Sequence, residues 1–403
     1  KITNGIAQED WVRAVREDKS VAGLLFAGTE GGLYTSQNGG ISWTKTQYGL
    51  PLCPISDITL RNNDLIVATL GRAFWILDDL SPIQQSTEIL TMSELSLVQP
   101  KTSYRFLSRD SRDDNSGANP YSGVIIDYFV PQGYDSLTIN LEIRDAEDNL
   151  VRTYSSEKDE SFKKYQGGPQ AEKRLSKEHG MNRINWDLRR GILPGVEKVF
   201  SLGSYSGSYV APGQYTLTLS DGERQKTQTV EILADPRTSI PQQDYDQQVE
   251  TLIKLENTVR DIYESVNDLR KVKGRIELID NQLQDIEGTD SLSSQTEKIL
   301  AKIMNWEEEL IQSKQKTFQD VINFPNQLSA EIMNLISRIN GNDPRMTQGA
   351  QKRSDQLIGE WSELKKEMSA IITEDIAAFN DAYQAQQIPI LVVPKVEKKI
   401  IKP

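Results

Sequence analysis

The sequence has very few of the residues on which many catalytic and metal sites depend. It contains one cysteine, Cys53, and one histidine, His179, among 403 residues. A single cysteine excludes an internal disulfide and a cysteine-based zinc site, and a single histidine excludes a multi-histidine metal site. No apolar run approaches the roughly 20 residues that a membrane-spanning helix needs. We therefore expect no bound metal of these kinds, no transmembrane segment and at most one histidine-based triad.

Positive charge is also in short supply. The chain has 46 Lys and Arg against 58 Asp and Glu, which gives a formal net charge of −12. An acidic chain repels phosphate backbones, so we expect no nucleic-acid partner. The sequence begins at Lys1 without a signal peptide, and this start suggests a processed or truncated product.

The composition changes along the chain and predicts a multidomain protein with all-β parts followed by an all-α part. The expected fold combines partial β-propeller blades, an Ig-like β-sandwich and a long antiparallel helical bundle or coiled coil. The predicted parts are propeller blades over 1–85, a linker over 86–120, the sandwich over 121–235, the bundle over 236–387 and a tail over 388–403.

The first zone is rich in glycine and contains an imperfect repeat. Residues 24–34 resemble residues 65–75, with Ala27 corresponding to Ala68 and Leu33 to Phe74, 41 positions apart. A repeat of this length, built from a strand, a glycine-containing turn and a second strand, is typical of propeller blades. The alternative is two ordinary hairpins. Since propellers close with about four to eight blades, we expect further blades upstream in a longer precursor or on another chain.

The second zone shows the alternation of half-buried strands. Apolar and polar residues alternate from Leu137 to Arg144, Asp221 and Gly222 form a hairpin turn, and Trp186 is the expected core anchor. Several short strands at this spacing predict an Ig-like sandwich. The polar insert over 155–180 is predicted to be a mobile surface loop.

The third zone changes to a helical period. Apolar residues recur every three or four positions from Leu252 to Ile286, which predicts a long amphipathic helix that ends at Gly288. Further helices are predicted over 292–324, stopped by Pro325, over 328–339, and over a last segment that includes 357–383. Short connections between long helices indicate antiparallel neighbours.

One motif in the first zone is a recognisable turn. Ser36, Asn38, Gly40 and Trp43 fit the pattern Ser-x-Asp-x-Gly-x-x-Trp, with Asn38 in the place of the aspartate. The asparagine can bond to backbone two residues on, glycine allows a positive φ, and the tryptophan packs beneath the loop. The motif resembles the Asp-box, or BNR, repeat of sialidases and sortilin-type receptors. That resemblance implies a structural element of a propeller and no catalytic role.

A second candidate site is the turn that contains Arg72 and Trp75. In one interpretation Arg72 points into a central funnel and binds a carboxylate or a sugar. In the interpretation that we favour, the segment is an ordinary blade turn, because no partner residue for Arg72 can be named.

The remaining charged clusters are weaker candidates. Asp110, Asp113, Asp114 and Asn115 could hold calcium, but their spacing is irregular and a solvated linker is the preferred interpretation. Neighbouring carboxylates such as Asp78 and Asp79 point in different directions on a strand and make poor acid–base pairs. We name no catalytic residue.

The order of these parts is more specific than any one motif. The Asp-box motif, the strands over 65–79 and the later segments 185–189, 211–215 and 235–237 together look like the C-terminal part of large bacterial Asp-box propeller proteins, frequent in Bacteroidetes. Those proteins are similar to the sortilin propeller and are often labelled glycosyl hydrolases. The middle zone resembles the Ig-like domain of the flagellar hook-capping protein. Members are exported, which implies a periplasmic or cell-surface location.

Two functions follow as expectations. The leading one is a non-catalytic interaction or scaffold part that binds a protein or glycan partner at the cell surface, where it could belong to an outer-membrane complex. The alternative is the C-terminal part of a sialidase-like glycosidase whose active site lies in upstream blades. Fold resemblance alone does not decide between them.

Overall fold

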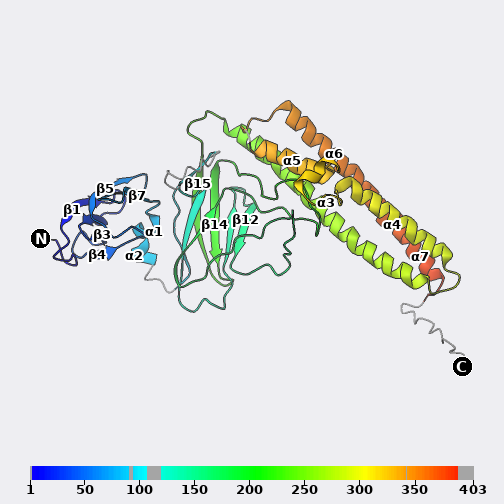
Figure 1. The fold of residues 1–403 in the computed structure, drawn as a ribbon, viewed down its shortest axis with the longest axis horizontal. Coiled ribbons are helices and arrows are strands. Elements are labelled where there is room, and N and C mark those ends of the chain that lie inside the picture. The colour runs from blue at the N-terminus through cyan, green and yellow to red at the C-terminus, as the bar shows by residue number, and fades with distance from the viewer. Residues whose placement is uncertain (1, 90–93, 107–118, 342, 389–403) are drawn as a thin grey trace, which may run out of the picture. The chain divides into compact units, whose positions relative to one another are not determined.

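The computed structural model describes residues 2–89, 94–106, 119–341 and 343–388. The chain forms two compact units, of which the first contains the strands and two short helices and the second contains the long helices (Figure 1). The predicted multidomain combination of β and α parts is therefore confirmed. The first unit comprises Lys1–Lys158, Lys173–Leu188 and Pro212–Arg237, and the second comprises Asp159–Glu172, Arg189–Ala211 and Thr238–Pro403.

Two antiparallel sheets begin the first unit, and within each sheet consecutive strands are neighbours. The two copies of the sequence repeat form the hairpins β2–β3 and β6–β7. The first sheet contains β1 (Val12–Glu17), β2 (Leu25–Thr29), β3 (Gly32–Ser36) and β4 (Thr44–Thr46). The second sheet contains β5 (Ile55–Arg61), β6 (Asp64–Thr69) and β7 (Phe74–Leu77), and the short helices α1 (Ser81–Gln84) and α2 (Ser86–Ile89) follow it.

These two sheets stack face to face and in the same sense. Gly28, which pairs with the N-terminal half of β1, lies against Ile55 at the start of β5, and a Cβ on Gly28 would be 2.5 Å from the Ile55 Cγ2. At the other end, the Gln84 amide donates to Asp18 just after β1 (2.9 Å) and to Asn63 just after β5 (2.7 Å). Because β1 and β5 lie beside each other and run in parallel, the second sheet repeats the orientation of the first.

The facing surfaces of the two sheets share one apolar core. A small sheet gains stability chiefly by burying a face against another element. Here the first sheet and the loops beside it contribute Leu24, Phe26, Leu33 and Leu50, and the second sheet and its flanks contribute Ile55, Ile58, Leu60, Leu65, Val67 and Leu80.

Two further sheets complete the first unit. Fully buried Trp186 and Tyr215 meet edge to face, with ring centroids 5.3 Å apart, and so join the two sheets. The Asp221 turn forms as predicted, but the strand expected from Leu137 begins at Asn140, because Leu137 N–H closes a turn onto the Tyr134 carbonyl. One sheet has the order β13 (Gly180–Trp186), β10 (Val124–Val130), β8 (Ser96–Leu97). The other has the order β12 (Leu150–Ser155), β11 (Asn140–Arg144), β14 (Gly213–Ser220), β15 (Gln225–Ala234), β9 (Ser103–Arg105).

The second unit is built around one long helix, which contacts three others (Figure 1). This helix, α3 (Gln242–Leu283), buries apolar residues at the predicted spacing of three and four, among them Leu252, Leu255, Val259 and Ile262. The others are α4 (Asp290–Leu310), α5 (Leu328–Asn340) and α6 (Gln348–Ala370), which continues through the π-helical segment η2 (Ile371–Ile376) into α7 (Ala377–Ala385).

The predicted helix over 292–324 is wrong in its second half. The helix α4 ends at Leu310, and Ile311 is already extended. Beyond it, the Asp320 carboxylate accepts hydrogen bonds from the backbone N–H of Lys316 and Thr317, which starts the short 3₁₀ helix η1 (Phe318–Ile322). These local side-chain bonds compete with a continuous helix, and an apolar period does not reveal them.

Two segments that interrupt the strand-rich sequence belong to the helical unit. The segment Arg189–Ala211 contributes Leu193, Val196, Val199 and Tyr205 to the helical core, and the segment Asp159–Glu172 joins the same unit. Neither segment was predicted to join the helices, since 159–172 lies in the predicted surface loop and 189–211 lies in the predicted sandwich.

A buried carboxylate on α3 holds the longer of these segments. Glu256 is 2% exposed, accepts the Ser208 backbone N–H at 2.5 Å, and pairs with the Arg190 Nε at 3.3 Å. Removing one member of a buried ion pair leaves the other charge uncompensated. Glu256 is therefore a buried, charged anchor between α3 and this segment.

We predict that Glu256→Ala lowers the free energy of unfolding of the helical unit by about 3–5 kcal/mol. The matched control is Glu250→Ala, which removes an exposed Glu250–Lys254 pair on the same helix and should cost about 0.3–0.5 kcal/mol. Urea unfolding, followed by the helical circular dichroism signal, measures both. Equal losses for the two variants would contradict the anchoring role.

Candidate functional site

The Asp-box residues form one hydrogen-bonded turn after β3. The Ser36 hydroxyl accepts the Gly40 N–H at 2.9 Å, and the Asn38 side-chain oxygen accepts the Ser42 N–H at 2.9 Å. Trp43 is buried against Ala27 and Tyr34 of the first sheet. Each predicted side chain is thus occupied in holding the turn, which leaves none of them directed at a ligand.

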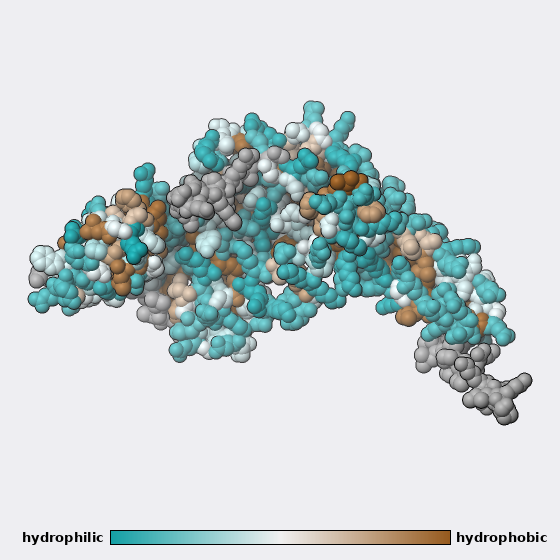
Figure 2. Space-filling model, viewed as in Figure 1, coloured by the Kyte–Doolittle hydropathy of each residue, from teal (hydrophilic) through white to brown (hydrophobic). Residues whose placement is uncertain are grey.

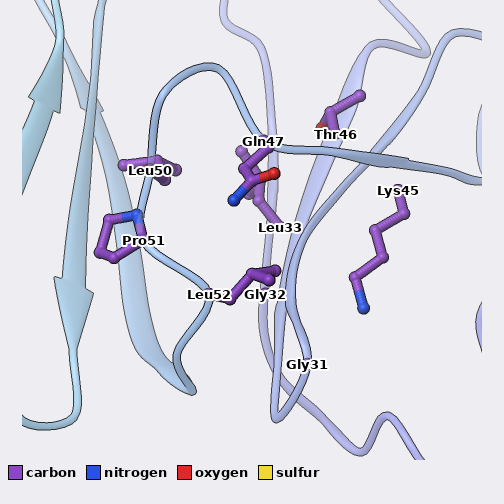
Figure 3. A pocket seen from close by; sticks show the side chains of 9 residues that line it. All are labelled: Gly31, Gly32, Leu33, Lys45, Thr46, Gln47, Leu50, Pro51 and Leu52. Atoms are coloured by element: carbon purple, nitrogen blue, oxygen red, sulfur yellow. The ribbon is translucent and has the colours of Figure 1, made fainter.

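A small hollow lies at the other end of β3, between the β2–β3 turn and the loop after β4 (Figure 3). Its volume is about 260 Å³, and Figure 3 shows Gln47 and Leu52 over the hollow and Lys45 at its side. The lining residues are Gly31, Gly32, Leu33, Lys45, Thr46, Gln47, Leu50, Pro51 and Leu52.

A polar network lies behind this hollow. The Tyr34 hydroxyl donates to the Asp10 carboxylate at 2.5 Å, and the Lys45 Nζ lies 3.3 Å from the same carboxylate. The bond from Tyr34 lowers the pKa of Asp10, Lys45 acts in the same direction, and burial opposes both. Burial, followed by the bond to Asp10, raises the pKa of Tyr34. The positive charge of Lys45 is therefore balanced by the Asp10 carboxylate, and the hollow offers mainly an apolar surface.

The structure brings Arg72 and Trp75 together in the β6–β7 turn. The Trp75 indole N–H donates to the Arg72 carbonyl at 2.8 Å, and Thr69 donates to the Ala73 carbonyl at 2.6 Å. Trp75 therefore stabilises the turn. The Arg72 side chain is exposed and forms no ion pair with a described residue.

The most exposed apolar surface on the second sheet lies next to this turn, and Figure 2 shows hydrophobic residues gathered over the N-terminal sheets. We call it the outer face; it points away from the first sheet and consists of Ile66, Ala68, Phe74 and Ile76. Phe74 is 76% exposed and Ile76 is 58% exposed. Among the described residues no element covers them.

The corresponding residues of β3 in the first sheet are buried. Because the sheets stack in the same sense, the pair Gly28–Leu33 corresponds to Ala68–Phe74, and Thr35 corresponds to Ile76. In the first sheet Leu33 is 2% exposed and Thr35 is 5% exposed, and Leu33 packs in the core shared with the second sheet. Sequence reasoning missed this face, although Phe74, Trp75 and Ile76 form an uninterrupted apolar strand.

The other predicted groups give no site. The proposed calcium loop, Asp110, Asp113, Asp114 and Asn115, lies outside the described residues. Within the described ranges, no three or more His, Cys, Asp or Glu side chains are placed to hold a metal ion. Burial and the nearby Asp64 charge raise the pKa of Asp78, whereas Asp79 accepts bonds from Ser81 and Asn63.

No helix among the described residues is long and apolar enough to cross a membrane. His179 bonds to the Val130 carbonyl through Nδ1 at 3.1 Å and packs edge to face on Phe129. These two contacts hold the His179 ring against β10 and give it a structural role.

Comparison with known proteins gives little. No protein-family model matches the chain, and no curated protein matches it. Among solved structures, the extracellular domain of a putative hybrid two-component system from B. thetaiotaomicron aligns with 56% of this chain and 25% of its own length, at 12% identity and a TM-score of 0.16. Dimeric latent PorU from Porphyromonas gingivalis aligns with 58% of this chain and 17% of its own, at 13% identity and a TM-score of 0.18. This chain spans a quarter or less of those proteins, and the similarities are too low to support an argument.

We predict that Tyr34→Phe raises the pKa of Asp10, because it removes the largest interaction that favours the charged carboxylate. Stability that Asp10 contributes in the native protein is present above its unfolded pKa of about 3.9 and is lost as pH falls through the lower folded value. The variant should lose part of this pH dependence. Carboxyl NMR titration of Asp10 measures the shift, and Lys45→Met should also raise this pKa. An unchanged pKa in Tyr34→Phe would contradict the account.

Proposed function

We propose that this chain is a non-catalytic interaction part of an exported Asp-box propeller protein, and that a further antiparallel sheet covers its outer face. The observation that carries the proposal is the difference between equivalent faces. Leu33 is 2% exposed in the first sheet, and its counterpart Phe74 is 76% exposed in the second. Fully burying a side chain such as Phe or Ile stabilises by about 1.5–3 kcal/mol, so a cover over Phe74 and Ile76 is strongly favoured.

The stacking of the first two sheets supports the propeller assignment. Neighbouring propeller blades are small antiparallel sheets that pack face to face with the same orientation around a centre. The parallel arrangement of β1 and β5 and the closed Asp-box turn after β3 agree with this arrangement. The covering sheet then belongs to the same ring, either on the same polypeptide or on another chain.

The other parts of the chain fit the same proposal. We assign the sheets joined by Trp186 and Tyr215 to an Ig-like sandwich, on the strength of that contact between two mainly antiparallel sheets. We assign the helices around α3 to an antiparallel bundle with the spacing of a coiled coil. In this proposal the sandwich and bundle support recognition of a protein or glycan partner at the cell surface.

The test places a photo-crosslinking amino acid, p-benzoylphenylalanine, at Phe74 in the protein expressed in its native host. We expect Phe74 to crosslink to a strand of another antiparallel sheet. Mass spectrometry of the joined peptides identifies that strand. The control carries the same amino acid at Leu278 on α3, which is 65% exposed.

The outcome must be specific to the outer face. A crosslink from Phe74 to a strand segment, absent from the Leu278 control, supports the proposal. Failure of Phe74 to crosslink while it remains accessible would contradict it. Crosslinking to scattered, unrelated peptides would also contradict it.

A further inference from the structure

We infer that the covering partner adds a fourth strand to the free edge of β7, as an extended segment with alternating apolar residues and an acidic residue at its C-terminal end. This inference rests on the proposed function and deepens it, since it names the recognition mode. The starting observation is the number of strands. The first sheet has β4 beside β3, whereas β7, the counterpart of β3, has β6 as its one neighbour among the described strands.

The backbone of β7 leaves hydrogen-bonding groups unused at this edge. The Thr69 N–H donates to the Ala73 carbonyl at 3.2 Å, so this pair is hydrogen-bonded between the strands. Bonded and non-bonded pairs alternate along an antiparallel ladder. The next bonded pair is therefore Val67 with Trp75, and the N–H and C=O groups of Phe74 and Ile76 point toward the free edge.

This edge also lacks the usual protection. Natural proteins shield edge strands with charged residues, proline, bulges or a covering loop. The β7 sequence is Phe-Trp-Ile-Leu, its pairing with β6 has no bulge, and Phe74 and Ile76 are mainly exposed. Such an edge is suited to strand addition, in which main-chain bonds provide affinity and alternate side chains provide specificity.

The existing fourth strand of the first sheet indicates which residues the added strand needs. In that sheet Thr46 lies opposite Leu33 and Thr44 lies opposite Thr35. The equivalent residues of an added strand lie opposite Phe74 and Ile76, with side chains on the outer face. Apolar β-branched residues suit both places, because cross-strand neighbours on one face pack together.

Arg72 defines one end of the added strand. An antiparallel strand beside β7 has its C-terminal end near Phe74, which follows the Arg72 turn. Among the residues that the structure describes, none forms an ion pair with the exposed Arg72 side chain. An acidic side chain just after the residue opposite Phe74 would pair with it, and this completes the recognition pattern.

The test uses the full chain and the synthetic peptide Thr-Val-Thr-Val-Asp-Thr, in which the valines lie opposite Ile76 and Phe74. Hydrogen–deuterium exchange, resolved to single amides by mass spectrometry, reports on Phe74 and Ile76. We expect saturating peptide to slow exchange at both amides by about tenfold, because they gain bonds that they lack in the free chain. A control peptide with both valines N-methylated lacks the N–H donors to the Phe74 and Ile76 carbonyls, and its methyl groups project into the space between the strands. It therefore cannot pair along this edge and should give no slowing.

A charge exchange tests the role of Arg72. We expect Arg72→Glu to weaken binding of the aspartate peptide by about two- to fivefold, and a peptide with lysine in place of the aspartate to restore it. Absence of slowing at Phe74 and Ile76, or equal slowing by the N-methylated peptide, would overturn the strand addition. If Phe74 still crosslinks to a sheet in that event, the covering sheet stands and the fourth strand alone fails; if both tests fail, the proposed function fails as well.

Discussion

The burial of one sheet face against another is the interaction on which the N-terminal part of this protein depends. Neither the first nor the second sheet is large enough to keep both faces in water. Contact between Gly28 and Ile55 is possible because the glycine has no Cβ, and it allows Leu33 and Phe26 to be fully buried beneath the second sheet. The same arrangement directs Phe74 and Ile76 away from the first sheet. These side chains therefore stay exposed unless a further element packs on them.

A comparable logic applies to the rest of the chain. Trp186 and Tyr215 join two sheets whose strands alternate along the sequence, and the other long helices pack on α3. The segment Arg189–Ala211 leaves the strand-rich sequence to join this helical core. The buried Glu256 carboxylate accepts a backbone N–H of this segment, because the polar backbone of an irregular segment needs hydrogen-bond partners when it is buried.

Part of this organisation could be predicted from the sequence. Periodic apolar residues predict α3, and Trp186 stands out as a core residue because it lies on an alternating strand. The repeat was located correctly, but equating Ala27 with Ala68 is wrong by one residue when the faces are compared. Ala27 lies on the face that packs on Trp43, whereas Gly28 pairs with Leu33 as Ala68 pairs with Phe74. A one-residue shift exchanges the two faces of a strand, and similar small residues do not reveal it.

The missed features have a common physical origin. The start of η1 after α4 depends on Asp320 bonding to backbone, and the place of Arg189–Ala211 in the helical unit depends on contacts with distant helices. The outer face is a property of a sheet's surroundings, since Phe74 would be an ordinary core residue if another sheet covered it. Local patterns specify strands and helices, but not their partners in space.

The most direct measurement is the accessibility of position 74 in the protein in its native setting. A Phe74→Cys variant in a Cys53→Ser background can be labelled with a maleimide, both in the purified 403-residue chain and in intact cells of the native host. The account predicts rapid labelling of the purified chain and strong protection in cells, while a Leu278→Cys control labels in both. Equal and rapid labelling of position 74 in both settings would contradict the claim that another sheet covers this face.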